Sequence, residues 1–179
     1  MISKLNIADI KLRNLVVQHI IIIGLGVLLI YIEELELASM FWEKVGLIIV
    51  SLGKSVYFIE HSFRKVEEAS LNNISYNHFL LIILVNILLI VVSFSADYMC
   101  MLSIDETSFR GINNSSLLDA IFDAFYFSIV SFTTVAYGDI VPVSKAAKLL
   151  TLLEVIIAYL TTIIIISNFV QIKDSLGKK

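Results

Sequence analysis

Residues 131–142 read Ser-Phe-Thr-Thr-Val-Ala-Tyr-Gly-Asp-Ile-Val-Pro and come directly after an apolar run with helical spacing, Leu117–Val130. Ser116 and Asp119 offer a cap for the start of a helix, which we expect over residues 116–133. The 14-residue apolar run is too short to cross the roughly 30 Å hydrocarbon core of a bilayer. A half-spanning helix followed by extended backbone predicts a re-entrant loop, which is allowed at membrane depth only where protein buries it or water fills it.

The composition of the whole chain is that of a membrane protein. Of its 179 residues, 58% are hydrophobic and 16% are charged, and the mean hydropathy is +0.91. Too few polar residues remain to cover a soluble domain of this length, which argues against a cytosolic enzyme and against a nucleic-acid-binding protein. The lone Cys100 cannot form a disulfide within the chain, and the net charge of -3 predicts no anionic partner.

Apolar segments predict four transmembrane helices around the re-entrant loop, so the expected fold is an all-α integral membrane protein. The first span is Leu15–Ile32, and the second, over about Leu37–Ile59, carries Glu43, Lys44 and Lys54. The expected division of the chain is a cytoplasmic N-terminus (1–14), two peripheral helices (15–60), a cytoplasmic connection (61–78), a pore domain (79–172) and a cytoplasmic tail (173–179). Within the pore domain we expect an outer helix (79–102), a pore helix (116–133), a filter (134–139) and an inner helix (146–171).

The distribution of charge predicts the orientation of these spans. Eight of the 13 Lys and Arg residues lie in residues 1–14, 60–78 and 173–179. The segments on the other side are acidic, and in this interpretation they include Asp97 and Asp105. Because cytoplasmic segments carry the excess of cations, both termini are expected in the cytoplasm of a multi-pass protein. An even number of spans follows, which supports the second one.

Thr134-Val135-Ala136-Tyr137-Gly138-Asp139 closely resembles the selectivity filter of potassium channels, Thr-Val-Gly-Tyr-Gly-Asp behind a pore helix. The resemblance extends over residues 79–172. It implies a homotetramer, because a closed ring of backbone carbonyls needs four strands and one chain supplies one. It also implies K⁺ as the permeant ion, with no other cofactor. The ion-binding residues implied are Thr134, Val135, Ala136, Tyr137 and Gly138, with K⁺ held at the first four, and Asp139 lies at the filter mouth.

One residue departs from the family pattern, because Ala136 stands where the family has Gly. If this position is left-handed, an L-residue costs about 1 to 2 kcal/mol in each subunit. Two outcomes are open: the surrounding packing holds the filter conformation with Ala in it, or the strand relaxes and K⁺ selectivity weakens. We favour the first, because every neighbouring residue fits the pattern.

The helices around the loop contain further candidate residues. Counting from the filter by resemblance, Tyr159, Thr162 and Ile166 are candidates for lining a central cavity, and their spacing puts them on one helix face. Glu154 is an intramembrane carboxylate, for which we expect a structural role and a hydroxyl partner, Ser128 or Ser131, on the pore helix. Lys54 is expected to extend toward the cytoplasm.

The predicted function is a potassium-selective channel in the cell membrane, with lipid, K⁺ and further copies of the chain as its partners. The alternatives are a weakly selective cation channel, owing to Ala136, and a nonconducting regulatory channel subunit. We expect no enzymatic activity and no nucleic-acid partner. The short polar loops indicate a bacterial plasma membrane.

Overall fold

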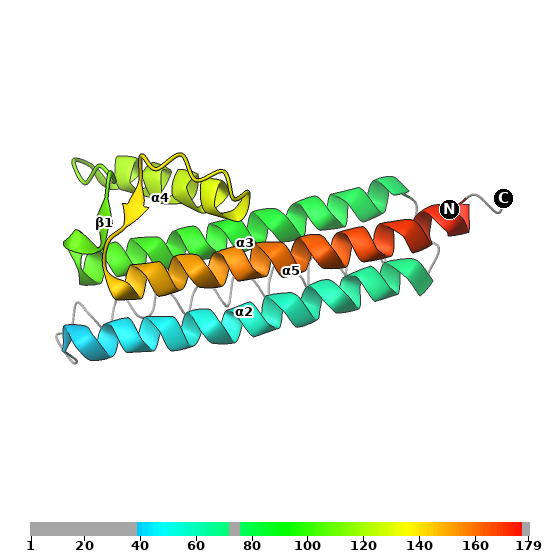
Figure 1. Ribbon diagram of the computed structural model, residues 1–179, viewed down its shortest axis with the longest axis horizontal. Coiled ribbons are helices and arrows are strands. Elements are labelled where there is room, and N and C mark those ends of the chain that lie inside the picture. The colour runs from blue at the N-terminus through cyan, green and yellow to red at the C-terminus, as the bar shows by residue number, and fades with distance from the viewer. Residues whose placement is uncertain (1–38, 72–75, 177–179) are drawn as a thin grey trace.

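The computed structural model describes residues 39–71 and 76–176, which are mostly helical. Three long helices lie side by side: α2 (Met40–Leu71), α3 (Tyr76–Ile104) and α5 (Lys145–Leu176) (Figure 1). The shorter α4 (Leu117–Phe132) lies against one end of α3. The predicted first span, Leu15–Ile32, and the N-terminal segment 1–14 fall outside the described residues.

Two of the described helices are long and apolar enough to cross a membrane, Leu80–Ile104 within α3 and Lys145–Ser167 within α5. Helix α2 is not one of them, so the second span stays a prediction from its apolar segment and from the charge distribution. It also runs well beyond the expected end at Ile59, to Leu71, and α3 begins at Tyr76. The expected connection 61–78 is therefore mostly helical in the described residues.

Local signals explain why α4 begins and ends where it does. Ser116 is the N-cap residue, and its hydroxyl oxygen accepts the backbone N–H of Asp119 at 3.2 Å. The Ser116 hydroxyl in turn donates to the Asp119 carboxylate at 2.7 Å, so the predicted cap is confirmed. At the other end, the Thr133 N–H bonds to the carbonyl of Ile129. Helix α4 therefore stops directly before the filter sequence.

A short antiparallel pair closes the segment that holds α4 and the loop after it. Strand β1 (Phe109–Arg110) pairs with β2 (Val141–Pro142). Gly111 follows β1 with φ +100°, and a Cβ placed there would lie 2.1 Å from the carbonyl oxygen of Asp139. Only glycine permits so close an approach. This contact and the strand pair together hold the end of the loop at Asp139.

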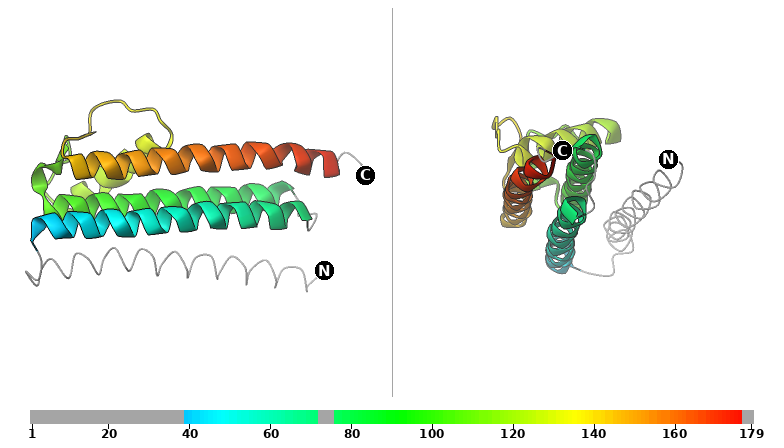
Figure 2. Two further views of the ribbon diagram at one scale, coloured as in Figure 1. Left: turned by 60° about the horizontal axis from the view of Figure 1, so that its bottom comes forward. Right: turned by 90° about the vertical axis from the view of Figure 1, so that its right-hand side faces the viewer.

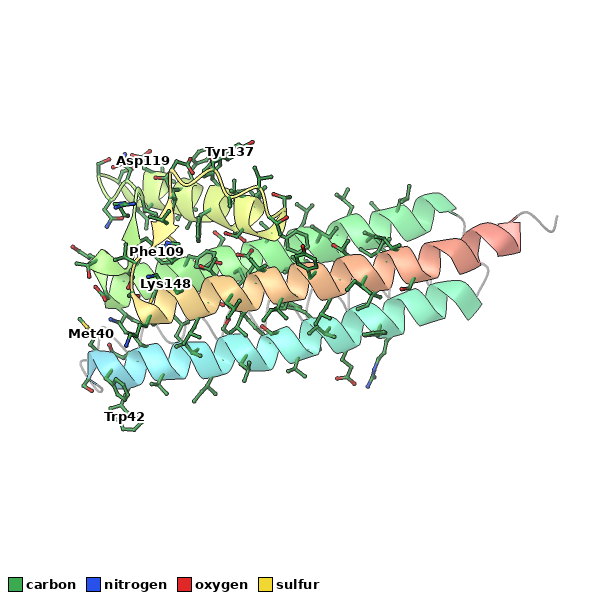
Figure 3. The ribbon with its side chains drawn as sticks, in the orientation of Figure 1. Met40, Trp42, Phe109, Asp119, Tyr137 and Lys148 are labelled. Carbon is green, nitrogen blue, oxygen red and sulfur yellow. The ribbon has the colours of Figure 1, made fainter. Side chains whose placement is uncertain are left out.

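An aromatic cluster packs α4 against α3. Tyr98 of α3 meets Phe127 of α4 edge to face, with ring centroids 4.9 Å apart. Phe109 contacts both rings, at 5.4 Å and 5.6 Å between centroids, from its place between α3 and α4 (Figure 3). Such edge-to-face contacts favour one relative orientation of the rings, and they hold the short helix on the long one.

Candidate functional site: the loop after the pore helix

The loop after α4 leaves the helix bundle as an arch beside α5 (Figure 2). Its first residues hydrogen bond back to the end of α4: the Thr134 N–H donates to the Ser131 carbonyl at 3.0 Å, and the Val135 N–H to that of Val130 at 3.1 Å. The start of the loop therefore moves with the last turn of α4.

The backbone of the loop alternates in handedness. Thr134 has φ +57°, Ala136 +50° and Gly138 +82°, whereas Val135 and Tyr137 are not among the residues with positive φ. Ala136 thus occupies a left-handed conformation that costs an L-residue about 1 to 2 kcal/mol. Which of the two outcomes for K⁺ selectivity holds stays a prediction. Thr134 carries the same kind of strain, which the sequence did not suggest.

Residues 133–139 are all exposed at the surface of the single chain. Val135 is 50% exposed and Tyr137 is 71% exposed. Tyr137 lies at the outer edge of the molecule (Figure 3).

Asp139 is anchored at the far end of the loop. The hydroxyl of Tyr126, on α4, donates a hydrogen bond of 2.7 Å to its Oδ2, and the N–H of Ile140 donates to Oδ1. These donors, that of Tyr126 above all, lower the pKa of the Asp139 carboxyl below its ordinary value. The resemblance placed Asp139 at the filter mouth, but it did not identify Tyr126 as its partner.

A pocket of about 440 Å³ lies at the inner end of the loop. Its lining comes from the last turn of α4, the first loop residues and the middle of α5: Phe132, Thr133, Thr134, Ala158, Tyr159 and Thr162. Two of the three candidate cavity residues therefore lie beside the start of the loop. Ile166, further along α5 and 63% exposed, is not part of the lining.

Glu154 of α5 is fully buried and does not line the pocket. Its carboxyl oxygens contact the hydroxyls of Ser128 on α4 and Tyr98 on α3, each at 2.5 Å. The expected pore-helix partner is thus Ser128, whereas Tyr98 was missed. The sequence held no signal for Tyr98, because its helix is apolar on all sides.

The expectation for Lys54 was wrong. Instead of extending toward the cytoplasm, Lys54 is 6% exposed, and its Nζ lies 2.5 Å from Oδ2 of Asp97 on α3. The same ammonium donates to the carbonyl and hydroxyl of Ser93 at 2.8 and 2.9 Å, and the Ser51 hydroxyl donates to Asp97 at 2.7 Å. Asp97 is therefore a buried residue of α3 and does not belong to an acidic outer segment. A buried charge needs a partner of this kind.

Comparisons with known proteins relate the same part of the chain to channels. A family model described as ion channel matches residues 80–173 of the 179, just over half of the chain. "Two-pore potassium channel 4" of Arabidopsis thaliana is 38% identical over 89 residues, which are 50% of this chain and 29% of that protein. No solved structure matches the chain.

Two microbial proteins are similar over shorter stretches. "Voltage-gated potassium channel Kch" of Escherichia coli strain K12 is 52% identical over 44 residues, 25% of this chain and 10% of that protein. "Hyperpolarization-activated voltage-gated potassium channel" of Methanocaldococcus jannaschii is 42% identical over 57 residues, 32% of this chain and 25% of that protein. The chain therefore spans less than a third of each of these three relatives.

Proposed function

The chain belongs to the ion channel family, and from that premise we propose that it conducts K⁺ selectively and passively through a pore shared by four copies. The observation that carries the proposal is the backbone of residues 134–138, in which Thr134, Ala136 and Gly138 all have positive φ. Alternating handedness turns successive carbonyl oxygens toward one side of a strand. Oxygens arranged in this way can replace the hydration shell of K⁺. Ion channels are not enzymes, and neither is this chain.

The exposed loop supports the assembly into tetramers. One chain brings one strand of carbonyls, and a ring that surrounds an ion needs four. Neighbouring copies would cover the exposed side chains of Val135 and Tyr137, which the single chain leaves in contact with solvent. Thr134, Val135, Ala136, Tyr137 and Gly138 are then the ion-binding residues, with K⁺ at the first four.

The pocket supports a path for the ion on the inner side of the filter. The last turn of α4 ends at it with Phe132 and Thr133, and the C-terminal end of a helix carries negative partial charge that favours a cation. Tyr159 and Thr162 would line this cavity, with Ile166 further toward the inner end of α5. Asp139 at the other end of the loop raises the local concentration of cations.

The protein's place in the cell follows from the same proposal. Four spans, residues 15–32 and helices α2, α3 and α5, would cross the plasma membrane of a bacterium, with both termini in the cytoplasm. In this orientation the β1–β2 pair and Asp139 face outward. The ion pair of 2.5 Å between Lys44 and Asp105, which joins the start of α2 to the end of α3, lies on that outer side.

A flux experiment with two matched glycine variants tests the proposal. Purified protein in proteoliposomes should release K⁺ much faster than Na⁺. Gly138→Ala should lower the K⁺ flux, because Gly138 has φ +82° and an L-residue there adds a further strained position to each proposed filter strand. Gly46→Ala adds the same methyl group to α2, where no atom outside the helix's own backbone lies within 4 Å, and should leave the flux unchanged. Equal K⁺ and Na⁺ release would favour the weakly selective channel, and no release from folded tetramers would favour a nonconducting subunit. Equal flux in both glycine variants would contradict the proposed filter.

A further inference from the structure

Three oxygen contacts connect Glu154 to the helices around it. The Tyr98 hydroxyl of α3 lies 2.5 Å from Oε2, and Oγ of Ser128 in the pore helix lies 2.5 Å from Oε1. Oγ of Ser128 is also 2.9 Å from the backbone carbonyl oxygen of Val91, in α3. These contacts form one chain that runs from α3 through α5 and α4 back to α3. All three side chains are buried.

The number of hydrogens available decides the charge of Glu154. A tyrosine and a serine hydroxyl each carry one hydrogen, and a backbone carbonyl carries none. If Glu154 is ionised, only two hydrogens are available for three contacts. In one contact two oxygen atoms then face each other with no hydrogen between them. If Glu154 is a neutral carboxylic acid, it adds the third hydrogen, and each contact becomes a hydrogen bond. Two oxygen atoms held 2.9 Å apart with no hydrogen between them repel each other, so the ionised form is disfavoured.

The charges around Glu154 also favour its neutral form. Among the described residues, Lys54 and Asp97 are the charged side chains that interact electrostatically with Glu154. Lys54 already has a carboxylate at 2.5 Å, that of Asp97. An ionised Glu154 would therefore be a second buried anion beside one cation, and such a charge is expensive within a membrane. The neutral acid leaves Lys54 and Asp97 as a balanced pair.

We propose that Glu154 holds a proton and acts as a positioning residue for the filter, donating from Oε1 to Ser128, which donates in turn to the Val91 carbonyl. The Tyr98 hydroxyl donates to Oε2. This inference rests on the proposed channel function. In that function, the protonated Glu154 holds the pore helix in position behind the ion path.

The last turn of α4 connects Ser128 to the proposed filter. Ser128 lies one turn before Phe132, where the helix ends. Within that turn, the carbonyls of Val130 and Ser131 accept the N–H groups of Val135 and Thr134. A displacement of Ser128 is therefore passed to the first filter residues, whose carbonyl spacing decides which ion fits.

Infrared spectroscopy tests the proton directly and requires no ion flux. Purified wild-type protein at neutral pH should show the C=O stretch of a protonated carboxyl group that is absent from Glu154→Gln. An Asp97→Asn difference spectrum separates the contribution of the second buried carboxyl group. A spectrum in which Glu154→Gln removes only carboxylate bands would overturn the proposal.

Permeability tests the positioning role. Glu154→Gln keeps one acceptor and a donor in the same shape, so its K⁺/Na⁺ permeability ratio should stay within about twofold of wild type. Glu154→Ala and Ser128→Ala each leave buried groups unpaired and should lower the ratio about tenfold. Ser55→Ala is the control, because its buried hydroxyl bonds only to the Ser51 carbonyl on its own helix at 2.6 Å in the described contacts.

The outcomes separate this inference from the proposed function. A Gln variant as impaired as the Ala variant, in tetramers of normal stability, would show that the charged carboxylate is needed and would overturn the inference. Equal permeability ratios in all the Glu154 and Ser128 variants would also overturn it. A wild type that conducts no K⁺ would contradict the proposed function, and the infrared comparison would still decide the state of Glu154.

Discussion

The hydroxyl of Tyr126 in α4 donates a hydrogen bond of 2.7 Å to the carboxylate of Asp139, at the far end of the loop that follows this helix. The loop is thereby held to α4 at both ends, since the Thr134 and Val135 N–H groups bond to the helix at the start. The curvature of residues 134–138 is fixed between these two attachments. The left-handed Ala136 is tolerated within a segment whose ends cannot move apart freely.

Tyr126→Phe should loosen the outer attachment and raise the pKa of Asp139. In the wild type, the Tyr126 hydrogen bond is the main cause of a pKa below the ordinary aspartate value, so its removal should return the pKa toward that value. Carbon NMR titration of the Asp139 carboxyl measures the shift. An unchanged pKa in the variant would mean that the hydrogen bond does not form in the assembled protein.

Ala136→Gly should stabilise the protein. Glycine adopts φ +50° without the Cβ penalty, so the variant should gain about 1 to 2 kcal/mol per subunit. The temperature at which the oligomer dissociates in detergent measures this gain. Ala147→Gly is the matched control, because Ala147 lies buried within α5 and glycine in a helix costs about 1 kcal/mol. Two variants that shift the dissociation temperature in the same direction would contradict the strain at Ala136.

Lys54→Met should destabilise the protein strongly. Removing one partner of a buried ion pair leaves the other charge uncompensated, at a cost of about 3 to 5 kcal/mol. Denaturant unfolding in detergent measures the loss, and a further Asp97→Leu replacement should restore much of it. Arg64→Met is the control, because the Arg64–Glu60 pair is exposed and contributes at most about 1 kcal/mol. Similar losses for Lys54→Met and Arg64→Met would contradict the burial of the Lys54–Asp97 pair.

The Lys44–Asp105 pair predicts a loss of stability in acid. Hydrogen bonds from Lys44 and Thr107 lower the pKa of Asp105 from 3.8 to about 2. The stabilisation is complete above pH 3.8 and disappears as the pH falls through about 2, because the unfolded chain takes up the proton first. Asp105→Asn should therefore be less stable than wild type at pH 5, and the two melting temperatures should converge near pH 2. A difference that is constant with pH would contradict this assignment.

The sequence predicted those features that depend on local pattern. Ser116 and Asp119 form a helix cap that depends only on residues close together in the sequence. The apolar runs of α3 and α5 predict long helices whichever helices they pack against. The predicted position of the filter rests on a contiguous motif, Thr134 to Asp139. Ser128 could be predicted as a partner of Glu154, because a buried carboxyl group requires a hydrogen-bonding partner nearby.

The pairing of side chains across helices could not be predicted in the same way. Lys54 and Asp97 lie on α2 and α3, and their contact depends on the relative rotation and height of two helices. Each charge, taken alone, was assigned to a membrane edge, as a charged residue in an apolar segment usually is. Tyr98 likewise gave no sign of facing Glu154, because α3 is apolar on all sides and its pattern marks no buried face.

The central claim is that peptide oxygens of residues 134–138 from four chains select K⁺. The most direct test is the reversal potential of purified wild-type protein in a planar bilayer with K⁺ on one side and Na⁺ on the other. The account predicts a potential close to the K⁺ equilibrium value, of the sign that K⁺ flow requires. A reversal potential near zero would contradict selective K⁺ conduction.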